Sequence, residues 1–200
     1  MNERETGIMI ALYGINSIGK STQAAMLVHR LEKEGFLAVH KKYPFYGLHP
    51  TGSILNAYLR EGNPYKLSPR EFQIFQAFNR THAERTMRGF LVNGTNVVAE
   101  DYTGTGIAWG MGAGIDKNFL ILINTHLYTE DVSILLDGDQ FESGREAKHK
   151  HENDRILTSE VRRYHKVLAN EFGWHIVNAN QDRDAVHEKI WSIVAPELER

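Results

Sequence analysis

The residues with the clearest chemical purpose lie near the amino terminus, where positions 14–22 read GINSIGKST. Positions 14–21 have the spacing GxxxxGK[ST] of a phosphate-binding loop, or P-loop. Glycines there allow backbone N–H groups to point inward at an anion, and the helix that follows adds its positive end. Lys20 would reach the β- and γ-phosphates of ATP, and the Ser21 hydroxyl would ligate Mg²⁺. We therefore predict that ATP is bound by Gly14, Asn16, Ser17, Ile18, Gly19, Lys20, Ser21 and Thr22.

The segments on either side of this loop decide between a phosphate site and an ordinary glycine-rich turn. GIMIALY at 7–13 precedes the loop and predicts a buried strand. Residues 19–34 follow it and predict an amphipathic helix, with Ala25, Leu27, Val28 and Leu31 on one side. A strand, a loop and a helix in this order are the setting that the motif requires, which favours the phosphate site.

The rest of the chain continues the alternation of strands and helices that would hold the loop in place. Ser68 is the expected N-cap of the longest helix, and Asn93-Gly94 predicts the turn after it. Apolar runs such as NVVA and SILL are unbroken, as expected of parallel strands buried on both faces. Strands are predicted at 7–13, 36–43, 95–101, 132–137 and 174–179, and helices at 19–34, 51–61, 69–92, 105–126, 155–172 and 182–199. This alternation predicts an α/β fold with a five-stranded parallel sheet.

Composition and charge narrow the class of protein further. The 200 residues fit one domain, residues 1–200, and 42% of them are hydrophobic, enough for a sizeable core. The formal net charge of −2 argues against a general nucleic-acid binder, and the lack of cysteine excludes disulfides and thiolate metal sites. The start MNERETG has no signal-peptide core and the apolar runs are short, so we expect a cytoplasmic protein without membrane or nucleic-acid partners.

The order of these segments resembles the thymidylate kinase family of P-loop nucleoside monophosphate kinases. GKSTQ and the helix after it are similar to the family's first helix, and Tyr43-Pro44 followed by Gly52 is similar to its second-strand segment. IFQAFNR resembles the family's helix that ends in Asn/Asp-Arg, and VVAEDYTGTGIAWG resembles the segment VVxDR[YH]xxSGxAF. The last two strands and the lid between them are matched by DVSILLDGD, GRE…NDR and VNANQDRDAVHEKIW. The similarity spans nearly the whole chain.

This resemblance implies a fold and an activity. The fold is that of a P-loop NTPase with three α/β/α layers, strand order 2-3-1-4-5 and a small lid at about residues 139–154. The activity is ATP- and Mg²⁺-dependent phosphorylation of a nucleoside monophosphate, with dTMP to dTDP as the first candidate. A homodimer formed through helices 69–92 and 107–126 is also implied. Two alternatives stay open: a kinase for another deoxynucleotide or a nucleoside, and a nucleotide-binding relative without kinase activity.

The resemblance also assigns roles to individual residues. Lys20 and Glu100, which takes the position of the family's Asp, are the expected catalytic residues of the main domain, and Ser21 and Glu100 the expected metal-site residues. Asn16 and Ser17 carry no charge, so the cations needed around the transferring phosphoryl group are expected from the lid, from Arg145 and Arg155. The acceptor nucleotide is expected to meet Tyr43, Pro44, His49, Phe75, Gln76, Arg80, Asp101, Tyr102, Thr105, Gly106 and Trp109.

Three positions in the acceptor region depart from the family's pattern. Asp101 stands where the family has an arginine, the loop after the Tyr-Pro pair has no arginine, and Gln76 replaces the aromatic residue that stacks on thymine. A carboxylate beside the acceptor phosphate would oppose binding by on the order of several kcal/mol. Either Asp101 points elsewhere, therefore, or the acceptor pocket is rebuilt. Arg80, Lys41, Lys42 or His49 could supply the missing charge, and Gln76 could hydrogen-bond a base edge.

Overall fold

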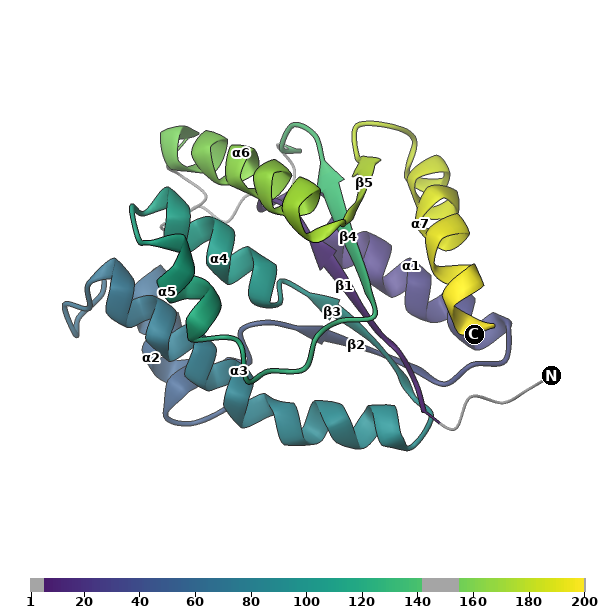
Figure 1. Ribbon diagram of the computed structural model, residues 1–200, viewed down its shortest axis with the longest axis horizontal. Helices are drawn as coiled ribbons and strands as arrows, with labels where there is room; N and C mark the ends of the chain where they lie inside the picture. The colour runs from purple at the N-terminus through teal and green to yellow at the C-terminus, as the bar shows by residue number, and fades with distance from the viewer. Residues whose placement is uncertain (1–5, 142–154, 200) are drawn as a thin grey trace.

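The protein is described by a computed structural model that places residues 6–141 and 155–199. Its strands and helices alternate along the chain, as the sequence predicts (Figure 1). The strands are β1 (Met9–Tyr13), β2 (Ala38–Lys42), β3 (Asn96–Glu100), β4 (Val132–Asp137) and β5 (His175–Asn178). The helices are α1 (Lys20–Lys33), α2 (Thr51–Arg60), α3 (Pro69–Val92), α4 (Thr103–Gly112), α5 (Lys117–Leu122), α6 (Arg155–Phe172) and α7 (Arg183–Leu198).

The five strands form one parallel sheet in the order β2-β3-β1-β4-β5, which confirms the predicted order. β1 is central, with Met9 opposite Val97 of β3 and Ile10 opposite Val132 of β4. Every residue of β1 and β3 is buried. Because parallel strands end at the same edge of a sheet, the segments after β1, β2 and β3 are brought together there.

Helices cover both faces of the sheet and give the three predicted layers. α1 and α7 pack together on one face, whereas α3, α4 and α6 cover the other, with α2 against α3 and α5 against α4 (Figure 1). One large apolar cluster runs through these layers, and a smaller one joins α2 to α3 through Leu55, Tyr58, Leu59 and Phe72. Among the described residues, no helix is long and apolar enough to cross a membrane.

The long helix α3 begins where the sequence predicts it. The Ser68 side chain accepts a hydrogen bond from the backbone N–H of Glu71 at 3.3 Å, and Glu71 Oε2 accepts one from the backbone N–H of Ser68 at 2.8 Å. Pro69 occupies the first helical position, where its missing N–H costs nothing. This reciprocal capping fixes the start of the helix that carries the acceptor side of the site.

The prediction of a single helix over 105–126 is wrong. Two helices, α4 and α5, occupy this stretch, and the chain turns between them. Gly114 adopts a left-handed φ of +79°, which ends the first helix, and the Asp116 side chain accepts a hydrogen bond from the N–H of Phe119 at 2.9 Å, which starts the second. The other predicted boundaries agree with the structure to within one or two residues.

Candidate active site

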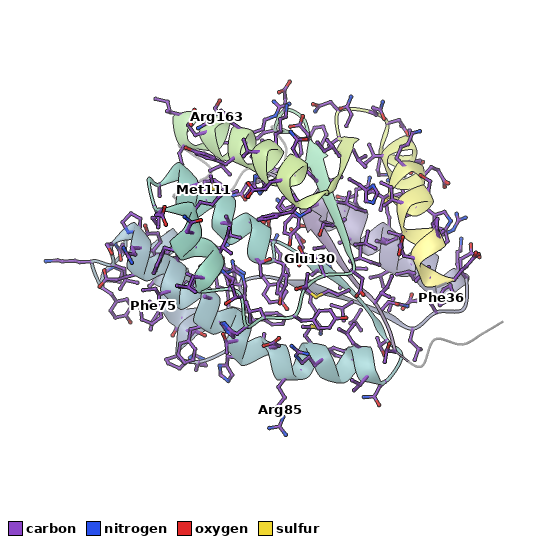
Figure 2. All side chains as sticks on the ribbon, viewed as in Figure 1. Phe36, Phe75, Arg85, Met111, Glu130 and Arg163 are labelled. Carbon is purple, nitrogen blue, oxygen red and sulfur yellow. The ribbon has the colours of Figure 1, made fainter. Side chains whose placement is uncertain are left out.

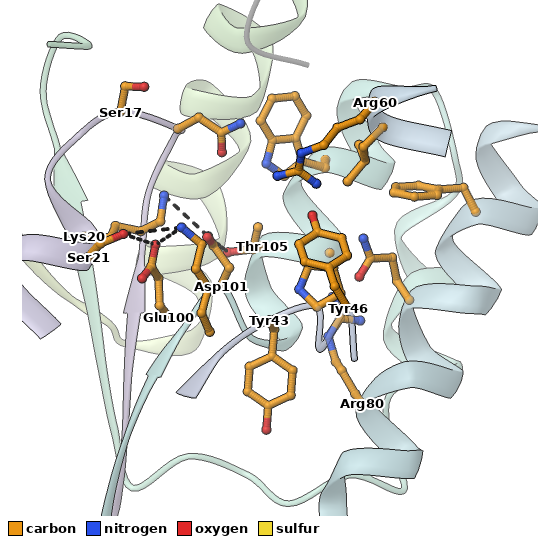
Figure 3. A pocket seen from close by; sticks show the side chains of 18 of the residues that line it. Ser17, Lys20, Ser21, Tyr43, Tyr46, Arg60, Arg80, Glu100, Asp101 and Thr105 are labelled. Atoms are coloured by element: carbon orange, nitrogen blue, oxygen red, sulfur yellow. Dashed lines mark hydrogen bonds and ion pairs between the residues drawn. The ribbon is translucent and has the colours of Figure 1, made fainter. Parts of the chain in front are cut away.

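A cavity of about 460 Å³ opens where β1, β2 and β3 end (Figure 3). Its wall is built from the P-loop, the segment after β2, helices α2 and α3, and the segment after β3 with α4. The predicted site residues that line it are Asn16, Ser17, Gly19, Lys20, Ser21, Thr22, Tyr43, Pro44, Gln76, Arg80, Glu100, Asp101, Thr105, Gly106 and Trp109. The fold therefore brings the ATP half and the acceptor half of the predicted site into one cavity.

The backbone of the P-loop takes conformations that its glycines permit. Gly14 has a φ of +139° and Gly19 a φ of +95°. A Cβ atom on Gly14 would lie 2.6 Å from the carbonyl oxygen of Leu136, so the loop passes β4 closely only because this residue is glycine. Gly14 and Ile18 do not line the cavity, and Ile18 is buried. These two residues therefore shape the loop rather than face the cavity.

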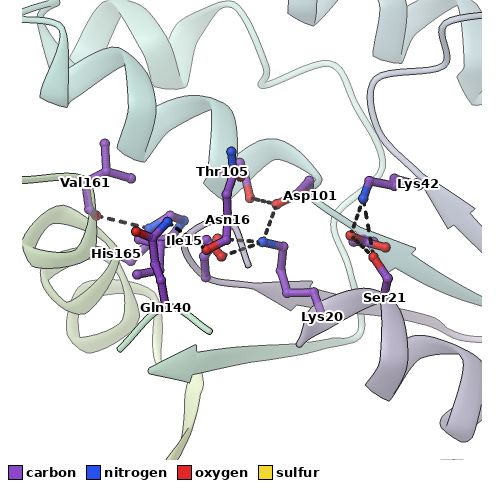
Figure 4. A network of polar contacts seen from close by, with 12 residues as sticks. Ile15, Asn16, Lys20, Ser21, Lys42, Asp101, Thr105, Gln140, Val161 and His165 are labelled. Atoms are coloured by element: carbon purple, nitrogen blue, oxygen red, sulfur yellow. Dashed lines mark hydrogen bonds and ion pairs between the residues drawn. The ribbon is translucent and has the colours of Figure 1, made fainter. Parts of the chain in front are cut away.

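Lys20, the first residue of α1, points back into the P-loop (Figure 4). Its Nζ donates hydrogen bonds to the carbonyl oxygens of Gly14 at 3.0 Å and Ile15 at 2.8 Å. It also lies 3.4 Å from Oδ1 of Asp101. The side chain is buried, so the ammonium is held at the P-loop end of the cavity, where the terminal phosphates of a nucleotide would lie.

Glu100, at the end of β3, is a buried carboxylate with three hydrogen-bond donors. Oε1 lies 2.7 Å from the Ser21 hydroxyl and 2.8 Å from Lys42 Nζ, and Oε2 lies 3.1 Å from His40 Nε2. Burial by itself would raise the pKa of Glu100, but the hydrogen bonds from His40, Lys42 and Ser21 lower it to about 2. An ionised carboxylate beside a hydroxyl supplies the oxygen atoms that Mg²⁺ prefers.

The Glu100 carboxylate and the Ser21 hydroxyl are the only metal-site feature that the predicted residues within the described part of the chain provide. Within 6–141 and 155–199, no group of three His, Cys, Asp or Glu side chains could hold a metal ion. Such a sparse donor set fits Mg²⁺ bound together with substrate phosphates, because Mg²⁺ at phosphate sites usually keeps several waters and takes one or two protein ligands. Ser21 and Glu100 would be those ligands, directly or through water.

Asp101 points toward the P-loop lysine. Its φ of +64° lies in the left-handed region, which is uncommon for a residue with a side chain. Oδ1 accepts a hydrogen bond from Thr105 Oγ1 at 3.0 Å and lies 3.4 Å from Lys20 Nζ (Figure 4). Burial raises the pKa of Asp101, and the neighbouring Lys20 opposes that shift. The carboxylate that replaces the family's arginine is thus compensated by a cation of the P-loop.

Helix α3 turns a polar face to the other end of the cavity. Gln73, Gln76 and Arg80 are 4%, 9% and 3% exposed, and all three line the cavity. Neither glutamine amide hydrogen-bonds to any residue that the structure describes, whereas Arg80 Nη1 donates to Asn124 Oδ1 at 3.1 Å. Nε of Arg80 has no partner among the described residues. Buried polar groups are normally hydrogen-bonded, so this face has the donors and acceptors to bind a polar ligand.

Gly106 makes room for the Arg80 guanidinium. A Cβ atom at this position would lie 2.4 Å from Nη2 of Arg80 and 3.0 Å from Cζ and Nη1. Burial lowers the pKa of Arg80, and Tyr102, Tyr13 and Tyr43 lie near enough to affect it. The glycine in α4 therefore lets a buried arginine approach the helix closely at the edge of the cavity.

Three of the predicted acceptor residues do not line the cavity. His49 is exposed in the loop before α2. Phe75 packs against the apolar cluster between α2 and α3, because it is one residue, or about 100° of helix rotation, away from Gln76. Tyr102 is buried and its hydroxyl donates a hydrogen bond to the carbonyl oxygen of Tyr128 at 3.1 Å. Burial raises the pKa of Tyr102.

The start of the predicted lid is joined to the P-loop. The backbone N–H of Phe141 donates to the carbonyl oxygen of Ser17 at 2.8 Å, and Gln140 Nε2 donates to that of Asn16 at 3.1 Å. Arg145 and the rest of the lid, residues 142–154, lie outside the described residues. Arg155 begins α6, but its side chain is likewise outside the described part of the structure. The assignment of these two arginines stays a prediction.

Comparison with known proteins identifies the family. The family model described as thymidylate kinase matches residues 12–190. The chain belongs to the thymidylate kinase family. Among curated members, it is 30% identical to the probable thymidylate kinase of Thermococcus kodakarensis, over 94% of this chain and 97% of that protein. It is 26% identical to the thymidylate kinase of Dictyostelium discoideum, over 97% of this chain and 87% of that protein.

A solved structure of the thymidylate kinase family supports the fold. The thymidylate kinase of Candida albicans superposes with a TM-score of 0.80, at 22% identity, and the match covers 96% of this chain and 92% of that one. At this identity the likeness bears on the fold alone. The five-stranded parallel sheet and its helical layers are therefore those of a thymidylate kinase.

The cavity of this thymidylate kinase family member also contains residues that the sequence did not single out. These are Tyr46, Leu59, Arg60, Phe72, Gln73 and Phe141. Gln73 had a recognisable signal, because it lies three residues before Gln76 and seven before Arg80, the spacing of one helix face. Tyr46 and Arg60 had none, since they lie in a loop and at the end of α2 and meet only when the two segments pack together.

Proposed function

We propose that this protein transfers the γ-phosphoryl group of ATP to a deoxynucleoside monophosphate, with dTMP as the first candidate acceptor. The observation that carries the proposal is the single cavity that joins the P-loop at Lys20 to the polar face of α3 at Arg80. Two substrates that bind at these ends would meet over the carboxyl end of β3. Membership of the thymidylate kinase family, and the names of its relatives, support the same reaction.

The reaction needs positioning and positive charge more than covalent help from the protein. An oxygen of the acceptor phosphate attacks the γ-phosphorus of ATP, the bond from that phosphorus to the β–γ bridging oxygen breaks, and ADP leaves with the bonding electrons. Lys20 would exchange the carbonyls of Gly14 and Ile15 for the β- and γ-phosphate oxygens. Mg²⁺ held by Ser21 and Glu100 would draw negative charge from those oxygens. Arg145 and Arg155 are proposed to add charge from the lid.

Asp101 is compatible with a charged acceptor in this reaction. Its carboxylate lies 3.4 Å from Lys20 Nζ and accepts a hydrogen bond from Thr105, so it does not face the acceptor side uncompensated. A salt bridge of this kind also keeps Lys20 near the P-loop before ATP binds. We infer that Asp101 positions the lysine, and that the acceptor phosphate is held by other cations.

A second candidate, a kinase for another deoxynucleotide, is favoured by the amides of Gln73 and Gln76. A carboxamide presents a donor and an acceptor side by side, which suits the hydrogen-bonding edge of a nucleobase. Two of them in place of a stacking aromatic residue would shift recognition from stacking toward hydrogen bonds. A site built in this way rejects bases that leave its buried amides unpaired.

A panel of acceptors tests these proposals directly. ADP release would be measured with ATP, Mg²⁺ and each of dTMP, dUMP, dCMP, dAMP, dGMP and thymidine. Fastest turnover with dTMP would support the leading proposal, and fastest turnover with another monophosphate would support the second. Preference for thymidine would identify a nucleoside kinase instead. ATP binding by calorimetry without turnover on any acceptor would contradict both proposals.

We also propose that the protein forms a homodimer through α3 and the α4–α5 region. Ile74 and Phe78 lie four residues apart on one face of α3, and they are 45% and 53% exposed. Leu122 of α5 is 67% exposed. Exposed apolar side chains that gather on a helix face are typical of a protein interface. Light scattering coupled to size exclusion would report the mass, and a monomer at micromolar concentration would contradict the proposal.

A further inference from the structure

Lys42, the last residue of β2, holds its ammonium at the two oxygen atoms proposed to bind Mg²⁺. Its Nζ lies 2.8 Å from Glu100 Oε1 and donates a hydrogen bond to the Ser21 hydroxyl oxygen at 3.3 Å (Figure 4). These two oxygens lie 2.7 Å from each other. Neighbouring ligands of an octahedral Mg²⁺ lie about 2.9 Å apart, because each is about 2.0 to 2.1 Å from the ion. The ammonium therefore contacts a pair of oxygens whose spacing also fits the metal.

Lys42 and Mg²⁺ cannot both use these oxygens, because two cations in contact with the same pair of atoms repel each other strongly. Of the ion pair, Glu100 is the fixed partner: it is 2% exposed, and Oε2 is held by His40 Nε2 at 3.1 Å. The Lys42 side chain is 57% exposed. An ion pair made by an exposed lysine contributes little free energy, so Lys42 is the partner that leaves at small cost.

The place of Lys42 in the sheet keeps a released ammonium at the cavity. Lys42 is paired with Glu100 across β2 and β3, and it lines the cavity itself. The next two residues, Tyr43 and Pro44, belong to the acceptor half. A lysine carries a compact charge on a flexible four-carbon stem, so the ammonium can turn toward that half without a change in the backbone. An acceptor phosphate, with close to two negative charges at neutral pH, would attract it there.

We propose that Lys42 exchanges between two partners: it pairs with Glu100 until Mg²⁺·ATP uses the oxygens of Ser21 and Glu100, and it then binds the phosphate of the acceptor. The inference rests on the proposed function, because it takes Mg²⁺·ATP and a monophosphate as the two ligands. Both ligands favour the same position of Lys42, so the two halves of the cavity are coupled. By linkage, each ligand should raise the affinity for the other by the same factor.

Removal of Lys42 should strengthen the binding of the metal complex. Calorimetry would measure the affinity for a non-hydrolysable ATP analogue, once with Mg²⁺ and once with EDTA. In Lys42→Met the affinity for the Mg²⁺ complex should rise about tenfold, because no charge-assisted hydrogen bond is displaced, and the affinity in EDTA should not rise. A lysine that held the phosphates of ATP would give the opposite result, a loss of affinity for the Mg²⁺ complex, and that result or an unchanged affinity would overturn the exchange.

Two other cations provide matched controls. Lys41 precedes Lys42 and points to the other face of the sheet, where its Nζ lies 4.7 Å from the centre of the Phe90 ring, and it does not line the cavity. Lys41→Met therefore removes the same charge from the same strand without a contact to Glu100. Arg85→Met removes a charge that projects into solvent from α3 (Figure 2). Both variants should bind the analogue like the wild type, with Mg²⁺ and with EDTA.

The acceptor side of the exchange is tested with dTMP and thymidine. Saturation with the Mg²⁺ complex of the analogue should strengthen dTMP binding about tenfold more in the wild type than in Lys42→Met, because the variant has no ammonium to release. Thymidine has no phosphate, and the two proteins should respond alike with it. The same response of both proteins with dTMP would overturn the inference, and so would an equal difference with thymidine, which would make the effect structural.

Further variants separate charge from shape and folding. Melting temperatures would show whether Lys42→Met is folded, and Lys42→Gln would replace it if methionine prevents folding. Lys42→Arg keeps the charge and should keep most of the coupling between the analogue and dTMP, whereas a coupling lost as completely as in Lys42→Met would contradict a role of the charge. A wild type that binds no monophosphate, with or without the analogue, would instead overturn the proposed function and the inference with it.

Discussion

The substitution Gly106→Ala tests whether α4 and α3 are packed around a buried guanidinium. The added Cβ atom would lie 2.4 Å from Arg80 Nη2 and 3.0 Å from its Cζ and Nη1. Ordinary contact distances between heavy atoms are about 3.5 to 4.0 Å, so either the helix or the guanidinium must move. Arg80 is 3% exposed, hydrogen-bonded to Asn124, and cannot move outward without leaving its pocket.

The expected magnitude follows from the cost of forcing a methyl group into a packed site. Overpacking of this kind costs about 1 to 3 kcal/mol of the free energy of unfolding. Replacing glycine by alanine inside a helix also stabilises the folded state by about 0.5 to 1 kcal/mol, which offsets part of the destabilisation from overpacking. Gly89→Ala in α3 provides the matched control, because a Cβ atom at Gly89 meets nothing within 4 Å and the helical gain is the same.

Urea unfolding and acceptor binding together measure the two consequences. Gly106→Ala should be less stable than Gly89→Ala by about 1 to 3 kcal/mol, which corresponds to a melting temperature about 2 to 12 °C lower for a chain of this size. The affinity for dTMP should also fall in Gly106→Ala, because the displaced Arg80 moves relative to the cavity. Equal stability of the two alanine variants together with unchanged dTMP affinity would refute the packing argument.

Further predictions concern Glu100, Gln73 and the lid. Glu100 has a pKa of about 2, below its ordinary value of 4.5, so its stabilising effect is complete above the ordinary pKa and is lost as the pH falls from 4.5 toward 2. Urea unfolding over this acid range should therefore show a shallower pH dependence in Glu100→Gln than in the wild type, and identical curves would contradict the charge network. Gln73→Leu should weaken binding of the preferred monophosphate about tenfold and broaden the choice of base in the acceptor panel, whereas an unaltered panel would exclude a base contact. Replacing Arg145 and Arg155 by alanine should lower turnover and leave ATP affinity unchanged by calorimetry, and undiminished turnover would remove the lid arginines from the mechanism.

Much of the fold could be predicted because its signals are local. The capping box at Ser68 and Glu71, the turn at Asn93-Gly94 and the unbroken apolar strands each involve residues close together in the chain. The break between α4 and α5 was missed, although Gly114 and Asp116 carry the signals that end one helix and begin the next. Apolar residues continue across this break at helical spacing, and their periodicity outweighed the turn signals.

The sequence by itself determined the P-loop and the family. Nine consecutive residues contain the loop glycines, Lys20 and Ser21, and consecutive residues are positioned by the backbone alone. The order of the later segments then identified the nucleoside monophosphate kinase pattern.

Only the tertiary structure decided what surrounds the acceptor. It directs Asp101 to Lys20, encloses Glu100 with His40 and Lys42, and seats Arg60 on Tyr46. Each of these contacts joins segments that are distant in the chain, and each depends on how strands and helices end and turn at one edge of the sheet. A helix rotates by about 100° per residue, so even the choice between Phe75 and Gln76 needed the packed position of α3.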